Sequence, residues 1–598
     1  MKRGNISTWT DIAKCRNLLF VAQLINELLF DYSIPSNRIS ALNSHYLCRD
    51  AMTTINTIEN NGVPESSLKP IVEELFRALS KDITFSSRNE NPLKYFLKAQ
   101  SNGSYVPTQR PEDLNYEDSK KVVYALHQKY FRTGWYRTAL FDDVRNLVKS
   151  NDEAVLQDLF RQTKALLTQL VNCGYSARYI SFITNKLLYS PRREVVDVDV
   201  IDELLNTFDC KKRKYRVVFL VNKHHQHFLR TINNIEFLDT LPQHGGSYYE
   251  AKFLKKRKGE RYILFETEAM DPFSAAEAQK NILLDNVSIF RMFDHNYSFN
   301  INELKCGVYD EKDFFFYLNE ETSPVQRAKT PSKETIEKKT SAVGAAIRKT
   351  VENRNISEFY SLFNAIRAHS LSLDSDSEQN QLLDLWSIFE AVLDISNKHT
   401  SDRIQQVCLY LVPILKRKYF YSLFAQLAND IKNYSEGAYK SIVEGATTEF
   451  DAINKLCSYV LLDDRKTERE QFLASCSDFP LLKERIEYYN AQLSTPLKIY
   501  EFAEKHAERV RWQVMRIYRN RNLIIHNGES TSYLKLLVEN LHSYVDDFLD
   551  YVIYSFGAGF DHVTMCQELF AKECEWREHF SNKKAVLTVE LIKEMLMQ

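Results

Sequence analysis

The chain has 598 residues, of which 44% are hydrophobic and 26% charged. This is the composition of an ordinary globular protein that is too long for a single core. Its 78 Lys and Arg residues are balanced by 79 Asp and Glu residues. This balance excludes a chain that binds nucleic acid with its whole surface, so any such binding must use a local basic patch. Only 15 Gly and 14 Pro residues are present, which favours helices over a turn-rich β architecture.

The cysteines and the N-terminal segment indicate a cytoplasmic protein. The ten cysteines are scattered and form no C-x-x-C pair, so neither a zinc ribbon nor a thioredoxin-type site is predicted. Residues 6–14 follow a basic start but are too polar for the apolar region of a signal peptide. No window approaches eighteen consecutive apolar residues, and we therefore expect no membrane span.

Residues 1–190 form the first predicted domain. Apolar residues recur there at steps of three and four, which is typical of amphipathic helices. No catalytic residue stands out in this segment. We expect a helical domain with a sensing, regulatory or assembly role.

Residues 191–320 form a predicted small α+β domain. Strands are expected over residues 216–221, 247–254 and 262–266, where β-branched and aromatic residues gather. Asp271 before Pro272 has the pattern of an N-cap followed by proline at the first helical position, opening a helix through Leu283. An aromatic run over residues 314–317 completes the domain.

Two polar stretches of this domain suggest ligands but have simpler explanations. Residues 224–227 read His-His-Gln-His, yet no acidic or cysteine residue lies at a familiar metal-ligand spacing from them. We interpret them as a polar segment after a strand and predict no metal or other cofactor. The basic residues 255–258 offer phosphate contacts but are more typical of a solvated hairpin tip.

Residues 321–356 form a predicted polar linker, with a helix beginning near its end. From residue 357 to residue 598 nearly every segment has the helical period, and we expect a bundle with a C-terminal helical extension. Trp576 is expected to pack back on the bundle. The predicted fold class is mainly α, with a small α+β part in the middle.

Residues 519–528, Arg-Asn-Arg-Asn-Leu-Ile-Ile-His-Asn-Gly, carry the strongest functional signal. Arg binds phosphate with two parallel donors and stays charged near neutral pH. His can take and give a proton near neutrality. Gly528 marks an expected helix end two residues after His526. Together these groups indicate chemistry on a phosphodiester.

A second segment lies well upstream of the first and contains Leu385, Trp386 and Glu390, preceded by the Arg-Ala-His sequence that ends at His369. Together the two segments resemble the HEPN superfamily, and most closely its ApeA-like group of bacterial proteins. In that family an early helix carries Leu-Trp-x-x-x-Glu and a later one ends in Arg-x4-6-His, often written Arg-Asn-x-x-x-His. The resemblance covers residues 357–555, about a third of the chain.

The resemblance implies a helical bundle that dimerises and cleaves RNA without a metal, often in anti-phage abortive infection or as a toxin. It also implies RNA, a second copy of the chain, and a phage trigger or an antitoxin as partners. Some HEPN proteins are inactive and only bind nucleotides or partners, and this remains the alternative. A third class, nucleotidyl or other phosphate transfer, is disfavoured because the sequence has neither a phosphate-binding Gly-x4-Gly-Lys-Ser/Thr loop nor a clear acidic metal pair.

Two arginines can be the motif arginine that pairs with His526, because Arg519 and Arg521 are both followed by Asn. We call these two alternatives the registers of the motif. On an unbroken helix Arg519 and His526 share a face, whereas Arg521 lies about 140° away. The compact Arg-Asn-x-x-x-His spacing favours Arg521, and we expect the helix to unwind around His526. We predict Arg521 as the catalytic arginine and Arg519 as a supporting phosphate contact.

The predicted catalytic residues are Arg521, Asn522 and His526. His526 would act as base or acid, Arg521 would stabilise the phosphorane and Asn522 would orient the site, with Glu390 holding the arginine. Residues 505–521 contain six basic residues and one acidic residue, and Arg516 lies on the expected basic stripe. The simpler alternative is a helix end at which His526 caps carbonyls and Arg521 forms an ion pair with Glu390.

Overall fold

The structure is a computed structural model. It describes residues 4–29, 42–60, 63–101, 103–221, 236–241, 248–256, 258–292, 294–295, 305–318, 333–352, 356–375, 377–393 and 403–597. As predicted, the described chain is mainly helical with a small sheet region. None of its described helices is both long and apolar enough to cross a membrane.

The chain divides into two compact units. The first contains Met1–Ala165, Val196–Val198 and Ser323–Gln598, and the second contains Leu166–Val195 and Asp199–Thr322. This arrangement differs from the predicted succession of an N-terminal helical domain over residues 1–190 and a separate bundle over 357–598. The helices at the two ends of the chain share one unit, because they bury apolar and charged side chains against each other.

The N-terminal part of the first unit is built from helices and a short hairpin. Its elements are α1 (Arg16–Leu29), α2 (Ser44–Glu59), α3 (Lys69–Leu79), α4 (Ile83–Ser86), β1 (Leu97–Ala99), β2 (Tyr105–Pro107), α5 (Tyr116–Leu126), α6 (Trp135–Ser150) and the start of α7 (Leu156–Cys173). Strands β1 and β2 pair in antiparallel fashion.

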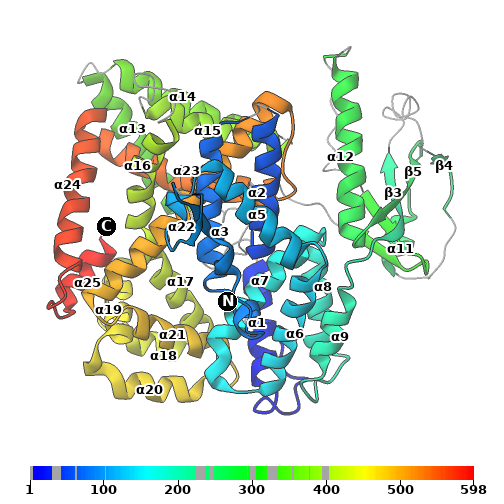
Figure 1. Cartoon of the computed structure of the whole chain (residues 1–598), viewed down its shortest axis with the longest axis horizontal. Coiled ribbons are helices and arrows are strands. Elements are labelled where there is room, and N and C mark those ends of the chain that lie inside the picture. The colour runs from blue at the N-terminus through cyan, green and yellow to red at the C-terminus, as the bar shows by residue number, and fades with distance from the viewer. Residues whose placement is uncertain are drawn as a thin grey trace. The chain divides into compact units, whose positions relative to one another are not determined.

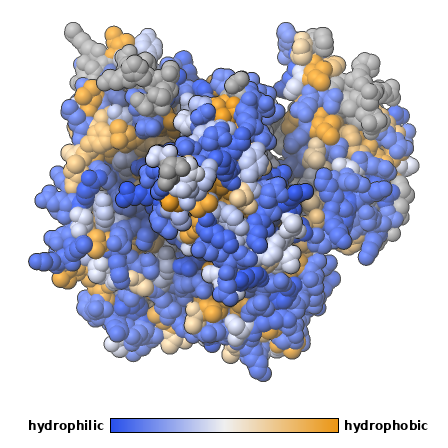
Figure 2. Space-filling model, in the orientation of Figure 1, coloured by the Kyte–Doolittle hydropathy of each residue, from blue (hydrophilic) through white to orange (hydrophobic). Residues whose placement is uncertain are grey.

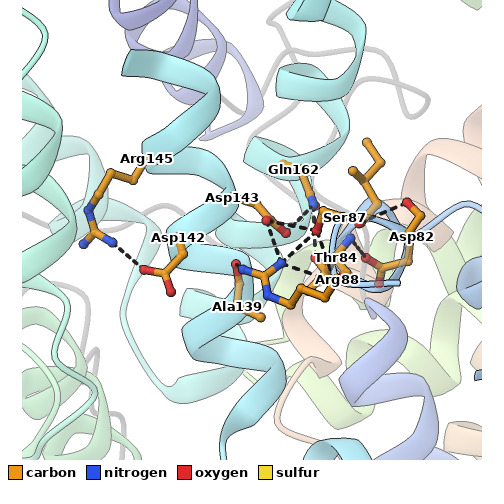
Figure 3. Close-up of polar contacts among 11 residues, drawn as sticks. Asp82, Thr84, Ser87, Arg88, Ala139, Asp142, Asp143, Arg145 and Gln162 are labelled. Atoms are coloured by element: carbon orange, nitrogen blue, oxygen red, sulfur yellow. Dashed lines mark hydrogen bonds and ion pairs between the residues drawn. The ribbon is translucent and has the colours of Figure 1, made fainter. Parts of the chain in front are cut away.

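A buried polar network joins α4, α6 and α7 (Figure 3). The Asp143 carboxylate accepts hydrogen bonds from Arg88 Nη1 at 2.7 Å and from Gln162 Nε2 at 3.1 Å. Gln162 also donates to Thr84 Oγ1 at 3.0 Å. Because buried polar groups are stable only when they are hydrogen-bonded, this network fixes how the three helices pack.

The C-terminal part of the first unit is a set of helices (Figure 1). They are α13 (Lys333–Glu352), α14 (Ile356–Asp374), α15 (Glu378–Val392), α16 (Arg403–Arg417), α17 (Tyr419–Tyr434), α18 (Glu436–Ile442), α19 (Glu449–Leu461), α20 (Lys466–Ser475), α21 (Pro480–Gln492), α22 (Pro496–Asn527), α23 (Leu534–Gly557), α24 (His562–Phe580) and α25 (Val589–Leu596).

Helix α13 occupies most of the predicted linker 321–356. It packs along α23, with Ala346 and Thr350 buried and Lys339 paired with Asp550 at 3.0 Å. The polar composition suggested a linker, but the small buried residues let α13 lie close to its neighbour. This part of the linker prediction is therefore wrong, and the helix predicted near its end begins much earlier.

Aromatic side chains fill the core between α15, α22 and α23. Trp386 is 1% exposed and lies 5.4 Å from the Tyr518 ring, measured between ring centroids. Phe389, next to Trp386 in the core, lies 5.1 Å from Phe548 in an edge-to-face arrangement. The predicted packing of Trp576 on the bundle is confirmed, since this side chain is buried and its ring lies 6.0 Å from the Phe420 ring of α17, measured between centroids.

The second unit contains an antiparallel five-stranded sheet in the order β4-β5-β3-β6-β7. Its elements are α8 (Ala177–Leu188), α9 (Val200–Thr207), β3 (Arg213–Val221), β4 (Glu236–Leu238), α11 (Tyr248–Phe253), β5 (Arg261–Ala269), α12 (Pro272–Arg291), β6 (Lys305–Tyr309) and β7 (Phe315–Leu318).

Strand β3 is buried on both faces. Val217 and Phe219 belong to the core that includes Leu283 of α12, which Figure 1 shows beside the sheet. Val218 points to the other face and packs with Phe253 of α11. Because both faces are covered, the strand reads as a continuous apolar run rather than an alternating one.

Some predictions for this unit are confirmed and one is wrong. Asp271 caps α12 by accepting hydrogen bonds from the backbone N–H of Phe273 and Ser274. Residues 247–254, predicted as a strand, contain helix α11. Its turn places Glu250 and Phe253 on one side, where both are buried, and this tertiary burial outweighs the strand preference of the aromatic residues.

The two polar stretches of this unit gave different outcomes. Residues 224–227 lie outside the described residues. In the basic run 255–258, Lys256 donates to the carbonyl of Asp239 and lies 5.6 Å from the centroid of the Tyr262 ring.

The visible face of the molecule is mostly hydrophilic with scattered hydrophobic residues (Figure 2).

A buried triad of charges joins α1, α17 and α21. Both Glu27 carboxylate oxygens accept hydrogen bonds from Arg485 Nη2 at 2.7 Å, and Asp430 lies 3.3 Å from Arg485 Nη1. All three side chains are at most 6% exposed. Removing the guanidinium leaves two carboxylates buried beside each other.

We predict that Arg485→Met destabilises the protein by about 3–5 kcal/mol, the range expected when one partner of a buried ion pair is removed. Lys483→Met is the control, because Lys483 on the same helix pairs with the partly exposed Glu153 and should contribute at most about 1 kcal/mol. Urea unfolding followed by circular dichroism compares the two. Equal losses would show that the triad contributes no more than a surface pair.

Candidate functional site

Helix α22 carries the predicted motif in its last turns. Thr495 caps its start by accepting a hydrogen bond from the backbone N–H of Lys498, and Pro496 occupies the first turn. The helix ends at Gly528, whose φ of 68° is left-handed and whose N–H donates to the carbonyl of Ile524 at 3.0 Å. The helix therefore stays intact through Asn527, and the predicted unwinding around His526 is wrong.

Arg519 is buried against the N-terminal helices. Its Nη2 lies 2.8 Å from Asp50 of α2, and its side chain is 11% exposed. The other Asp50 oxygen accepts a hydrogen bond from the Tyr533 hydroxyl at 2.8 Å. Burial and the nearby Asp50 charge raise the pKa of Tyr533, so this hydroxyl remains a donor. The predicted phosphate contact by Arg519 does not fit, because its guanidinium is enclosed by a carboxylate.

Arg516 is buried in the same way. Its guanidinium pairs with Glu74 of α3, and its side chain is only 3% exposed. Burial alone would lower the pKa of Arg516, but Glu74, Tyr533 and Asp50 together raise it. The predicted RNA contact through Arg516 is wrong, because the helix face that appeared as a basic stripe is covered by acidic residues from a distant part of the sequence.

Arg521 lies on a more open face of α22. Its Nη2 is 3.2 Å from Glu390 Oε1, and its Nη1 donates to Asn522 Oδ1 at 3.2 Å. The same Glu390 oxygen accepts a hydrogen bond from Trp386 Nε1 at 3.1 Å. The side chains of Arg521 and Glu390 are 22% and 33% exposed. The structure thus brings four predicted motif residues together and keeps Arg521 accessible.

His526 lies exposed in the last turn of the helix. It follows Arg521 by five residues, which on a continuous helix separates the two side chains by about 140°. The segment after the helix is held by Thr531, which donates to Asn520 at 2.8 Å, and by Ser530, which accepts from Gln379 at 3.3 Å.

This arrangement can bind an anion and exchange a proton. A guanidinium has five N–H donors. Arg521 donates to Glu390 through Nη2 and to Asn522 through Nη1. Its remaining donors can contact a phosphate oxygen from the open side. His526 is close to bulk water, as a group that takes and gives protons requires.

The structure brings together a second cluster of polar side chains that the sequence did not predict. His369, His542 and Asp546 place three ligand atoms within 4.8 Å of one another, although no metal site was predicted. The signal available was the four-residue step from His542 to Asp546, which puts both on one face of a helix. Nothing in the sequence indicated that His369, from a much earlier segment, would complete the group.

Comparisons of the chain with protein-family models, with curated proteins and with solved structures found no match.

We predict that Arg519→Met and Arg521→Met differ sharply in stability, although they lie two residues apart. Arg519→Met removes the partner of the buried Asp50 carboxylate and should cost about 3 kcal/mol or more. Arg521→Met breaks a partly exposed pair, which should contribute about 1 kcal/mol or less.

The midpoints of urea unfolding under identical conditions measure the difference. Tyr533→Phe serves as a further control, because it removes only one hydrogen bond to Asp50. If the two arginine variants unfold at the same urea concentration, Arg519 is not a structural residue and the two registers of the motif are open again.

Proposed function

We propose that the chain is a metal-independent endoribonuclease of the HEPN type, with Arg521, Asn522 and His526 as its catalytic residues. The observation that carries the proposal is the placement of Arg521. It is the motif arginine with an accessible guanidinium, and a Trp386–Glu390 contact orients it from behind. We further propose a cytoplasmic effector of anti-phage abortive infection or a toxin, controlled by a phage trigger or an antitoxin.

RNA is the substrate whose cleavage requires the fewest catalytic groups from such a site. It carries its own nucleophile, the 2′-hydroxyl, so no metal-bound water is required. The protein must remove that proton, stabilise the charged phosphorane and protonate the leaving 5′-oxygen. His526 supplies proton transfer, Arg521 supplies the charge, and Asn522 restrains Arg521 through its carbonyl oxygen. The products are a 2′,3′-cyclic phosphate and a 5′-hydroxyl.

The reaction needs an acid and a base, and each chain supplies one His526. A two-fold symmetric dimer would provide the second imidazole from the other copy. The exposure of His526 at a helix end is compatible with this, since a side chain that faces solvent in one copy can face a partner.

The alternative function is a non-catalytic HEPN module that binds nucleotides or a partner protein. One observation favours it: Arg521 already has a carboxylate partner in Glu390, as a purely structural helix end would. Substitution of His526 distinguishes the two functions, because it should abolish RNA cleavage by a nuclease but leave binding by a non-catalytic module unchanged.

We predict that the purified protein cleaves RNA in the presence of EDTA. His526→Ala should lower the rate about 10²–10⁴-fold through loss of proton transfer. Arg521→Ala should lower it about 10²–10³-fold through loss of charge stabilisation. Single-turnover cleavage of a labelled RNA measures both, and the end groups of the products identify the mechanism.

Two variants control for charge and for the histidine itself. Arg509→Ala removes an exposed arginine from the same helix, and His579→Ala removes a histidine from α24. Both should cleave at the wild-type rate. Cleavage that survives in His526→Ala and Arg521→Ala, or that requires Mg²⁺, would refute the mechanism. Binding of RNA without cleavage, equal in wild type and His526→Ala, would favour the non-catalytic module.

The dimer is tested by mixing wild-type chain with the His526→Ala variant. A mixed dimer keeps only one of the two imidazoles, so it should cleave about as slowly as the His526→Ala dimer if the site combines both copies. Mass measurement in solution accompanies the assay. A monomer with full activity would contradict the composite site.

A further inference from the structure

The His369, His542 and Asp546 side chains meet between two helices of the first unit. His369 comes from α14, and the other two come from α23, where their four-residue spacing puts them on one helix face. His542 is buried, whereas His369 and Asp546 are partly exposed, at 25% and 45% of their side chains.

The distances resemble those between ligands of one metal ion. His369 Nε2 lies 3.4 Å from Asp546 Oδ1, and His542 Nε2 lies 3.8 Å from the same oxygen. In a tetrahedral zinc site with bonds of about 2.0–2.1 Å, neighbouring ligand atoms are about 3.3 Å apart. The two imidazole rings are stacked, with 5.3 Å between their centroids.

The lysines near Asp546 form their ion pairs with other carboxylates of α23. Lys418 pairs with Asp547 and Asp550 at 3.2 Å and 3.0 Å, and Lys339 pairs with Asp550 at 3.0 Å. The two lysines are therefore engaged by the other acids of α23.

The ring nitrogen of His369 faces the Asp546 carboxylate without a hydrogen bond of ordinary geometry. Its Nε2 is buried and makes no hydrogen bond within ordinary geometry to the part of the chain that the structure describes. At 3.4 Å, its separation from Asp546 is at the long limit for a hydrogen bond. A cation between the three groups would bond the nitrogen and the carboxylate at once.

We propose that His369, His542 and Asp546 bind a divalent transition metal, Zn²⁺ by their chemistry, with water as the fourth ligand. Two neutral imidazoles and one carboxylate suit Zn²⁺, whereas Mg²⁺ and Ca²⁺ prefer oxygen ligands throughout. The partly exposed Asp546 leaves room for the water. The ion would link α14 to α23 and is separate from the chemistry proposed for Arg521 and His526.

Metal binding is tested directly on the full-length, tag-free chain after dialysis against a chelator. Isothermal titration calorimetry with ZnCl₂ should show one Zn²⁺ per chain. Co²⁺ in place of Zn²⁺ should give the intense visible absorption of a tetrahedral site. His369→Gln and Asp546→Asn should each weaken binding more than about 100-fold, beyond the loss typical of residues that only support a ligand.

The matched control is His579→Gln. His579 also pairs with a carboxylate, Glu594, at 2.6 Å, and it lies on α24. The His579→Gln variant should bind Zn²⁺ with the same affinity as the wild-type protein. Circular dichroism must show that the variants are folded. Absence of Zn²⁺ binding, or binding that is unchanged in both His369→Gln and Asp546→Asn, overturns the proposal.

The same variants separate this proposal from the proposed RNA cleavage. Asp546→Asn retains Arg521 and His526, so it should cleave RNA in EDTA as wild type does under the same conditions. Cleavage without metal binding would refute only the metal site, and metal binding without cleavage would refute only the nuclease.

Discussion

Two buried pairs of charges hold the long helix α22 against the N-terminal helices, and the candidate site depends on them. Glu74 pairs with Arg516, and Asp50 pairs with Arg519. A buried charge without a partner is costly, so each pair fixes the rotation of α22 about its own axis. That rotation places Arg519 inside and turns Arg521, two residues later, toward the open face beside Glu390. The N-terminal helices thus decide which motif arginine can meet a ligand.

The same packing gives the N-terminal segment Met1–Ala165 a physical role. The Arg485–Glu27 pair and the Arg519–Asp50 pair connect elements from the two ends of the sequence. Helices α2 and α3 therefore supply the buried partners of the helix that carries the candidate site, and they belong to the same compact unit as the bundle.

The two candidate sites of the first unit use histidine differently. His526 lies exposed at the end of the helix that carries Arg521, which suits proton exchange with a bound anion. His369 and His542 lie against each other and against a carboxylate, which suits a cation. Both sites draw on helices of the C-terminal bundle. The proposed RNA cleavage is thus assigned to the C-terminal end of α22, and the proposed metal site lies between α14 and α23.

The sequence by itself determined the helical class, the packing of Trp576, the capped start of α12 and the local Arg-Asn-x-x-x-His motif, since these follow from periodicity, caps and neighbouring residues. It did not reveal that the chain ends share one unit, that α13 replaces a linker, or that residues 248–253 are helical. Only the tertiary structure decided that Arg516 and Arg519 are buried, Arg521 is accessible, and His369 meets Asp546. The physical reason is that burial and charge pairing depend on partners from distant parts of the sequence, whereas helix periodicity and capping depend only on neighbours along the chain.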